Sequence, residues 1–118
     1  MLKYDVGQRY QTHHDYGIED LALACGPRIL TFFLYLSDVD SGGETYFPSL
    51  NLTVKPKKGL ALLWPSVLDA DPEQQDTRTY HEAKPVIAGV KYAANAWIHL
   101  YDYKTPNLWG CTGSFDEL

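Results

Sequence analysis

Short apolar runs separated by glycine, proline and acidic turns characterise this chain of 118 residues. No stretch keeps a 3.6-residue apolar period over three helical turns, so we expect helix to be scarce. The clearest strand runs over residues 28–36, is rich in aromatic and β-branched side chains, and ends at the polar turn 37–43. Further short strands are predicted over 44–48, 52–54 and 60–64.

The second half of the chain continues this pattern. Residues 66–76 are polar and acidic without an apolar face, which predicts an exposed loop, and strand character resumes over 80–86 and 90–101. In the last strand, period two places five side chains on one face: Lys91, Ala93, Asn95, Trp97 and His99. A lysine inside a β-domain needs an anionic partner, so this face predicts a ligand cavity, with a solvent-facing strand surface as the alternative.

Composition limits the class of protein. Residues 1–118 are expected to form one compact domain, since the chain has 118 residues and is 45% hydrophobic and 21% charged. The pattern of short strands makes this an all-β sandwich or barrel. A net charge of −5 without clustered Lys and Arg argues against a nucleic-acid partner. No apolar run reaches the roughly 18 residues that a membrane span needs. Cys25 and Cys111 permit one disulfide without requiring it, so their state stays open.

Three side chains have the chemistry of a mononuclear iron site. His13 and Asp15 lie two residues apart, so an extended backbone points both to the same side, while His14 points away to the core edge or solvent. His81 would arrive from a distant strand to complete two imidazoles and one carboxylate, the set that holds Fe(II) with open positions. An H-x-D triplet arises readily by chance, so its specificity depends on the surrounding sequence.

Five segments of the chain resemble the catalytic domain of the prolyl 4-hydroxylase family. They occur in that family's order and at its separations over roughly residues 4 to 113, which chance does not explain. The segments are YDVGQRYQTHHDY (4–16), LYLSDV and GGETYFP (34–48), PKKGLALLW (56–64), DTRTYHEAKPV (76–86) and GVKYAANAWI (89–98).

This resemblance implies a double-stranded β-helix, or jelly-roll, that uses Fe(II), O₂ and 2-oxoglutarate, with ascorbate sustaining activity. It assigns the metal to His13, Asp15 and His81. Lys91 takes the position that pairs with the distal carboxylate of 2-oxoglutarate, Tyr4 and Thr31 take positions that hydrogen-bond the cosubstrate, and Trp97 is the catalytic residue beside its pocket. The implied reaction decarboxylates 2-oxoglutarate to succinate and CO₂ and hydroxylates a C–H bond.

The chain departs from the family's pattern in length. Family members place helices and further strands ahead of the segment that begins at Tyr4, whereas three residues precede it here. We therefore expect a jelly-roll core without the usual N-terminal helices, either as a fragment of a longer chain or as a minimal form. An exposed sheet edge is expected to favour a homodimer or aggregation.

Three functions remain open at this stage. The first is hydroxylation of peptidyl proline; the second keeps the chemistry but acts on a free amino acid, a lysyl side chain or another small molecule; the third is a metal-binding jelly-roll without turnover. Arg78 and Glu82 either orient His81 or form a surface ion pair. The terminal Asp116-Glu117-Leu118 resembles part of an endoplasmic reticulum retention signal and predicts that location, with the cytoplasm as the alternative.

Overall fold

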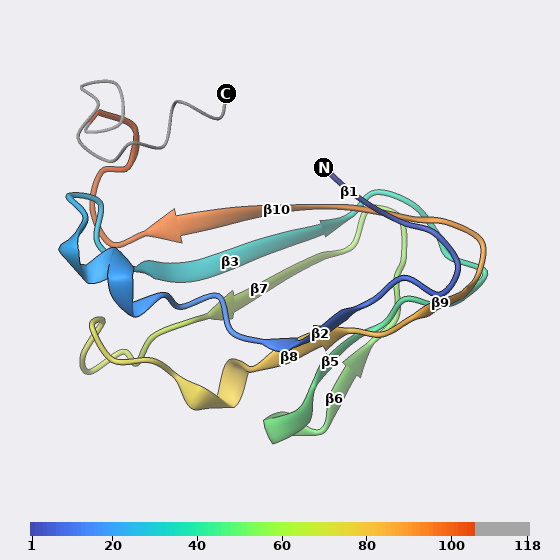
Figure 1. Cartoon of the computed structure of the whole chain (residues 1–118), viewed down its shortest axis with the longest axis horizontal. Helices are drawn as coiled ribbons and strands as arrows, with labels where there is room; N and C mark the ends of the chain where they lie inside the picture. The colour runs from blue at the N-terminus through green and yellow to red at the C-terminus, as the bar shows by residue number, and fades with distance from the viewer. Residues whose placement is uncertain (106–118) are drawn as a thin grey trace.

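Two antiparallel four-stranded sheets face each other in the computed structural model, which describes residues 1–105 (Figure 1). Both sheets join strands from distant parts of the sequence, which is the arrangement of a jelly roll and confirms the predicted fold class. The main sheet has the order β1 (Leu2–Tyr4), β10 (Lys91–His99), β3 (Arg28–Tyr35), β7 (Ala61–Pro65). The minor sheet has the order β2 (Tyr10–His13), β8 (His81–Ala83), β5 (Thr45–Phe47), β6 (Leu52–Val54).

Short elements connect these strands. β4 (Ser41–Gly42) pairs with β9 (Val86–Ala88) beside the two large sheets. Three 3₁₀ turns, η1 (Ile18–Ala22), η2 (Pro48–Leu50) and η3 (Thr77–Thr79), complete the order of elements. Helix is scarce in the described part, as the absence of a 3.6-residue period predicted. No helix in residues 1–105 is both long and apolar enough to cross a membrane.

The core lies between the sheets because β3 alternates inward and outward side chains. Its inward residues Thr31, Phe33 and Tyr35 are buried. A cluster of mainly aromatic side chains fills the space that they face, and each fully buried member contributes on the order of 2–3 kcal/mol of hydrophobic stabilisation. The cluster consists of Phe33, Tyr35, Phe47, Trp64 and Ala93, with Leu2, Val54, Leu60 and Leu62 packed against it.

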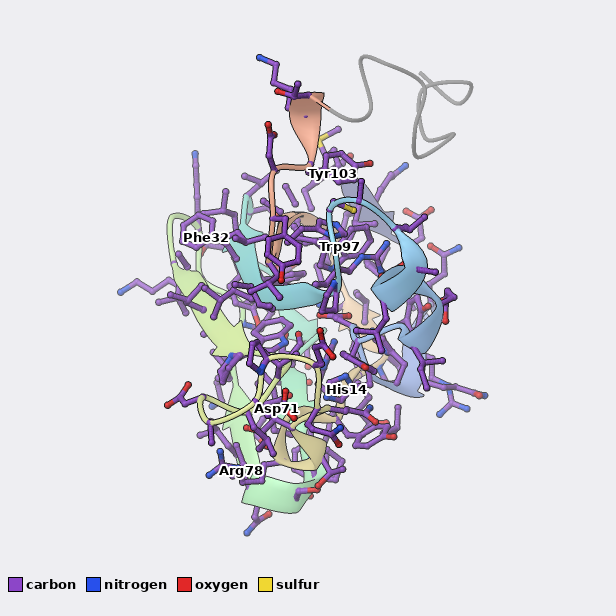
Figure 2. All side chains as sticks on the ribbon, turned by 90° about the vertical axis from the view of Figure 1, so that its left-hand side faces the viewer. His14, Phe32, Asp71, Arg78, Trp97 and Tyr103 are labelled. Atoms are coloured by element: carbon purple, nitrogen blue, oxygen red, sulfur yellow. The ribbon has the colours of Figure 1, made fainter. Side chains whose placement is uncertain are left out.

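The outer face of the main sheet is apolar as well. Phe32 pairs with Leu63 of β7 and with Ala96 of β10, and Ile98 lies further along β10. Phe32, Leu63 and Ile98 are 37%, 61% and 43% exposed. Figure 2 shows Phe32 and the inward-facing Trp97 on opposite sides of this sheet.

Two consecutive glycines permit close packing near the lysine of β10. Gly42 has φ +81°, and a Cβ there would lie 2.3 Å from the carbonyl oxygen of Pro85. Gly43 has φ +71°, and its Cβ would lie 3.2 Å from Cδ of Lys91. Side chains other than glycine are strained at such angles, so the Gly-Gly pair lets β4 pass against β9 and leaves room for the Lys91 side chain.

The six predicted strands lie where β3 and β5 to β10 occur, with one exception, whereas the short strands β1, β2 and β4 were not predicted as strands. The segment 80–86 was predicted as one strand, and this was wrong: β8 ends at Ala83 and β9 begins at Val86. Pro85 lacks a backbone N–H, and at this point the chain leaves β5 to pair with β4. Cys25 is buried, whereas Cys111 and the terminal Asp-Glu-Leu lie outside the described residues, so the predictions about them stay predictions.

Candidate metal and cosubstrate site

The three predicted metal ligands converge at one end of the minor sheet. His13 is the last residue of β2 and lies directly opposite His81, the first residue of β8. Oδ1 of Asp15 lies 3.7 Å from Nε2 of His13 and 3.5 Å from Nε2 of His81. All three candidate ligand atoms lie within 4.8 Å of one another. One metal ion placed between them could therefore bind all three.

Backbone contacts fix the two imidazoles in the tautomer that a metal requires. Nδ1 of His13 lies 2.8 Å from the carbonyl oxygen of Gln11, and Nδ1 of His81 lies 2.9 Å from the carbonyl oxygen of Thr79. A carbonyl oxygen only accepts, so each Nδ1 donates its hydrogen and each Nε2 keeps its lone pair for the metal. The residues present thus fit an Fe(II) ion.

A hydrogen bond from the opposite sheet orients the carboxylate. The Thr31 hydroxyl donates to Oδ2 of Asp15 at 2.5 Å, and both side chains are buried. Because Thr31 belongs to β3, this bond links the metal site to the centre of the main sheet. It occupies Oδ2 and leaves Oδ1 directed at the two histidines. Burial lowers the pKa of His81, while the nearby Asp15 carboxylate opposes that shift, so the ring stays neutral and able to bind metal.

Lys91 forms the cationic end of the site. Its side chain is 1% exposed, and Nζ has no hydrogen-bond partner among the described residues. Nζ lies 5.3 Å from the ring centre of Tyr4 and 5.6 Å from that of Phe33. Burial lowers the pKa of Lys91 to about 8, and Glu44 opposes the shift. A buried ammonium without a partner is costly, so the position calls for an anionic ligand.

One cavity of about 250 Å³ contains both the metal ligands and Lys91. Its lining includes six of the seven predicted site residues, namely His13, Asp15, His81, Lys91, Tyr4 and Trp97. The cavity therefore has a metal-binding end and a cationic end, which suits a dicarboxylate that chelates metal through one terminus. Burial, followed by the nearby Tyr10, raises the pKa of Tyr4, so its phenol remains protonated and able to donate.

Other predicted residues have different contacts from those expected. Thr31 is absent from the cavity lining and bonds Asp15, so its predicted contact with the cosubstrate stays a prediction. Trp97 is 42% exposed and stacks against the Arg28 guanidinium, 3.8 Å from its ring centre. Arg78 pairs with Asp76 at 2.7 Å and leaves the orientation of His81 to the Thr79 carbonyl.

Nine further residues line the cavity without having been predicted as site residues. They include Tyr10, His14, Arg28, Thr45 and Asn95. Asn95 shares the period-two face of Lys91, and Thr45 belongs to the Gly-Gly-Glu-Thr segment, so both had a signal in the sequence. The Tyr10 ring lies 3.9 Å from that of His13, and the Thr45 hydroxyl bonds the Tyr35 hydroxyl. Neither contact follows from spacing along the chain.

Comparison with known proteins agrees with this geometry. Residues 1–99 match the model of the 2OG-Fe(II) oxygenase superfamily. The chain belongs to this superfamily. The match includes all three metal ligands and Lys91, so the cavity with a metal end and a cationic end is the site that the superfamily's name leads one to expect.

Within this superfamily, the chain is similar to proteins that are named as prolyl hydroxylases. The chain is 40% identical to prolyl 4-hydroxylase subunit alpha-1 of Gallus gallus, covering 84% of this chain and 20% of the relative. It is 39% identical to probable prolyl 4-hydroxylase 8 of Arabidopsis thaliana, covering 87% and 42%. The structure of a viral collagen prolyl hydroxylase from Paramecium Bursaria Chlorella virus-1 in its 2OG complex aligns with a TM-score of 0.75 and 35% identity, covering 85% and 56%. The chain thus spans less than half the length of these two curated relatives.

Proposed function

We propose that the protein is an Fe(II)- and 2-oxoglutarate-dependent dioxygenase that hydroxylates proline in peptides. The observation that carries the oxygenase chemistry is the pairing of the metal triad with the unpartnered Lys91 ammonium in one cavity. The choice of proline rests on the relatives, which are named as prolyl 4-hydroxylases and a collagen prolyl hydroxylase.

Each end of the cavity has a separate task in this proposal. Bound Fe(II), with 2-oxoglutarate and O₂, supplies the oxidising chemistry that hydroxylates an unactivated C–H bond. His13, Asp15 and His81 would hold the metal, and a metal with three protein ligands would keep positions free for the cosubstrate. Lys91 binds the distal carboxylate and so decides which way the cosubstrate lies. The buried rings of Phe33 and Trp64 line the same cavity and keep bulk water from it.

The exposed part of the cavity suits a peptide. Trp97 presents an aromatic surface there, stacked against Arg28, and Nε of Arg28 is buried without a hydrogen-bond partner among the described residues. Aromatic surfaces bind proline-rich segments in the polyproline II conformation, and a guanidinium can donate to peptide carbonyls. This favours a peptide over a free amino acid. Three further features belong to the proposal. Ascorbate dependence rests on the resemblance, a homodimer on the exposed sheet edge, and a location in the endoplasmic reticulum on the resemblance and the terminal Asp116-Glu117-Leu118.

The test measures succinate formation by the purified protein with Fe(II), 2-oxoglutarate and ascorbate, with and without a short proline-rich peptide, followed by mass spectrometry of the peptide. We expect peptide-stimulated succinate and the gain of one oxygen on proline. A matched peptide with alanine in place of proline is the substrate control, and His81→Ala is the enzyme control. Succinate without peptide oxidation would overturn the substrate, and bound iron without succinate would overturn the oxygenase activity.

A further inference from the structure

His14 uses both of its ring nitrogens, although it lies outside the metal triad. The backbone N–H of Tyr16 donates to Nδ1 at 2.9 Å. A backbone N–H cannot accept, so Nδ1 holds the lone pair and Nε2 carries the hydrogen. Nε2 then donates to the carbonyl oxygen of Asp76 at 2.8 Å, with the Thr79 hydroxyl oxygen at 3.1 Å. The sequence predicted a histidine that points to the core edge or solvent, and this side chain instead joins two distant segments.

The segment that His14 contacts is the one that orients His81. Asp76 immediately precedes η3 and Thr79 is its last residue. The Asp76 carbonyl oxygen also accepts from the backbone N–H and hydroxyl of Thr79 at 3.3 Å and 3.2 Å. The Thr79 carbonyl oxygen in turn accepts from Nδ1 of His81 at 2.9 Å. His14 is bonded in sequence to His13 and Asp15. Three consecutive hydrogen bonds therefore connect the His13–Asp15 segment to His81. They run from His14 to Asp76, from Thr79 to Asp76 and from His81 to Thr79.

The pairing of β2 with β8 is irregular where the metal ligands lie. The register between β2 and β8 shifts between the pair Tyr10 and Ala83 and the pair His13 and His81, and Asp15 lies beyond the end of β2. The side chain of His14 adds a second connection between the same segments just past the last paired residues. It is one residue from both ligands of the first segment, so a shift of this ring displaces them directly.

We propose that His14 is a positioning residue that sets the separation between the His13–Asp15 segment and His81, and thereby the affinity and geometry of the metal site. It binds no metal itself. Partners that orient metal ligands typically contribute about 10- to 100-fold to metal affinity. His14 also packs against Tyr80, with ring centres 4.9 Å apart, so a purely structural role in stability is the competing explanation that the experiment must separate.

The experiment titrates the metal-free protein with Co(II), whose visible absorption reports both affinity and coordination geometry, and needs no peptide or turnover. His14→Leu removes the polar contacts of the ring with Tyr16, Asp76 and Thr79, whereas His14→Gln keeps an N–H close to the position of Nε2. Val54→Ala is the matched control, because Val54 packs against the core from the edge strand β6 and loses stability without touching the site. Thermal denaturation of the metal-free forms measures each loss of stability.

We expect His14→Leu to weaken Co(II) binding at least tenfold and to alter the spectrum, His14→Gln to restore affinity to within about threefold, and Val54→Ala to leave both unchanged. Thr79→Val removes only the hydroxyl that contacts Nε2 of His14 and the Asp76 carbonyl oxygen. Combined with His14→Leu it should therefore cost no more affinity than His14→Leu alone. Wild-type affinity and spectrum in His14→Leu would overturn the proposal. Equal losses in His14→Leu and in a Val54→Ala protein of equal stability would overturn it too.

Discussion

The two ends of the cavity satisfy their polar groups in opposite ways. At the metal end, both histidines donate through Nδ1 to backbone carbonyls and Asp15 accepts from Thr31. At the cationic end, Nζ of Lys91 is buried without a partner among the described residues. The protein therefore pre-orients its metal ligands, but leaves the charge of Lys91 to be neutralised by what binds there.

This difference has an energetic consequence. A fall in the pKa of Lys91 from 10.5 to about 8 means that burial disfavours the charged amine by roughly 3 kcal/mol, since one pKa unit corresponds to about 1.4 kcal/mol. A bound carboxylate would relieve that cost. The contacts at the metal end should therefore hold the ligands in place without a bound ligand, whereas binding of an anion at Lys91 should raise the stability of the protein. The substitutions below test the two ends separately.

The largest effect is expected from the metal ligands. Asp15→Ala or His81→Ala should weaken Co(II) binding by more than about 100-fold, because each removes one of only three protein ligands. Co(II) absorption titration of the metal-free protein measures this. His99→Ala is the control, because His99 bonds the Gly26 carbonyl and stacks on Tyr103 away from the triad. Tight binding by His81→Ala would remove His81 from the ligand set.

Replacement of Lys91 should change the cationic end of the cavity and leave the metal ligands as they are. Lys91→Met should leave Co(II) affinity unchanged and weaken 2-oxoglutarate binding by about 100-fold, since truncation of a buried charge partner costs roughly 2–5 kcal/mol. The same change should raise the melting temperature of the ligand-free protein, because it removes an unpartnered buried ammonium. Calorimetry of 2-oxoglutarate binding to the Co(II) form and thermal denaturation measure the two effects. Unchanged cosubstrate affinity would contradict the role of Lys91.

The pH dependence of cosubstrate binding should follow the same side chain. Lys91 is mostly charged well below its pKa of about 8 and mostly neutral well above it, so 2-oxoglutarate affinity should stay level below about pH 7 and fall about tenfold between pH 7 and pH 9. The stability of the ligand-free protein should move the other way and rise above pH 8, since the unfolded state then binds the extra proton. Lys91→Arg keeps its charge and should lose the decline in affinity; a decline that persists would assign it to another group.

The smallest effect is expected at the hydrogen bond from Thr31 to Asp15. Thr31→Val should weaken Co(II) binding about three- to tenfold, because Oδ2 of Asp15 loses its donor while the three ligands remain. Thr31→Ser keeps the hydroxyl and should bind as the wild type does. If Thr31→Val instead left Co(II) affinity intact and weakened 2-oxoglutarate binding, the contact with the cosubstrate predicted from the sequence would be the right one.

The sequence predicted the residues of the site better than the contacts among them. His13, Asp15, His81 and Lys91 were predicted from side-chain chemistry, from period two and from the resemblance, because those signals depend on residue type and spacing. The bond from Thr31 to Asp15 joins the main sheet to the segment that follows β2, and spacing along a chain carries no information about which hydroxyl faces which carboxylate. The orientation of His81 by the Thr79 carbonyl was missed for a similar reason, since every residue has a carbonyl.

Alternation along a strand and pairing between strands differ in how far the sequence predicts them. His99 shares the predicted face of Lys91 but was expected beyond the pocket, and it does lie outside the cavity lining, past a register shift between Ile98 and His99. The segment 80–86 was predicted as a single strand because its side chains suit a strand, yet the chain changes pairing partners at Pro85. Pairing is a property of the whole sheet, so local propensity cannot locate such changes.

The apolar outer face of the main sheet has a practical consequence for all of these measurements. Phe32 and Leu63 are directly paired neighbours that remain 37% and 61% exposed in the folded protein. Dyes that fluoresce on apolar surfaces normally report unfolding, because folded proteins hide such surfaces. Here the native protein should already bind the dye, so its fluorescence would start high and melting should be followed by circular dichroism or calorimetry instead.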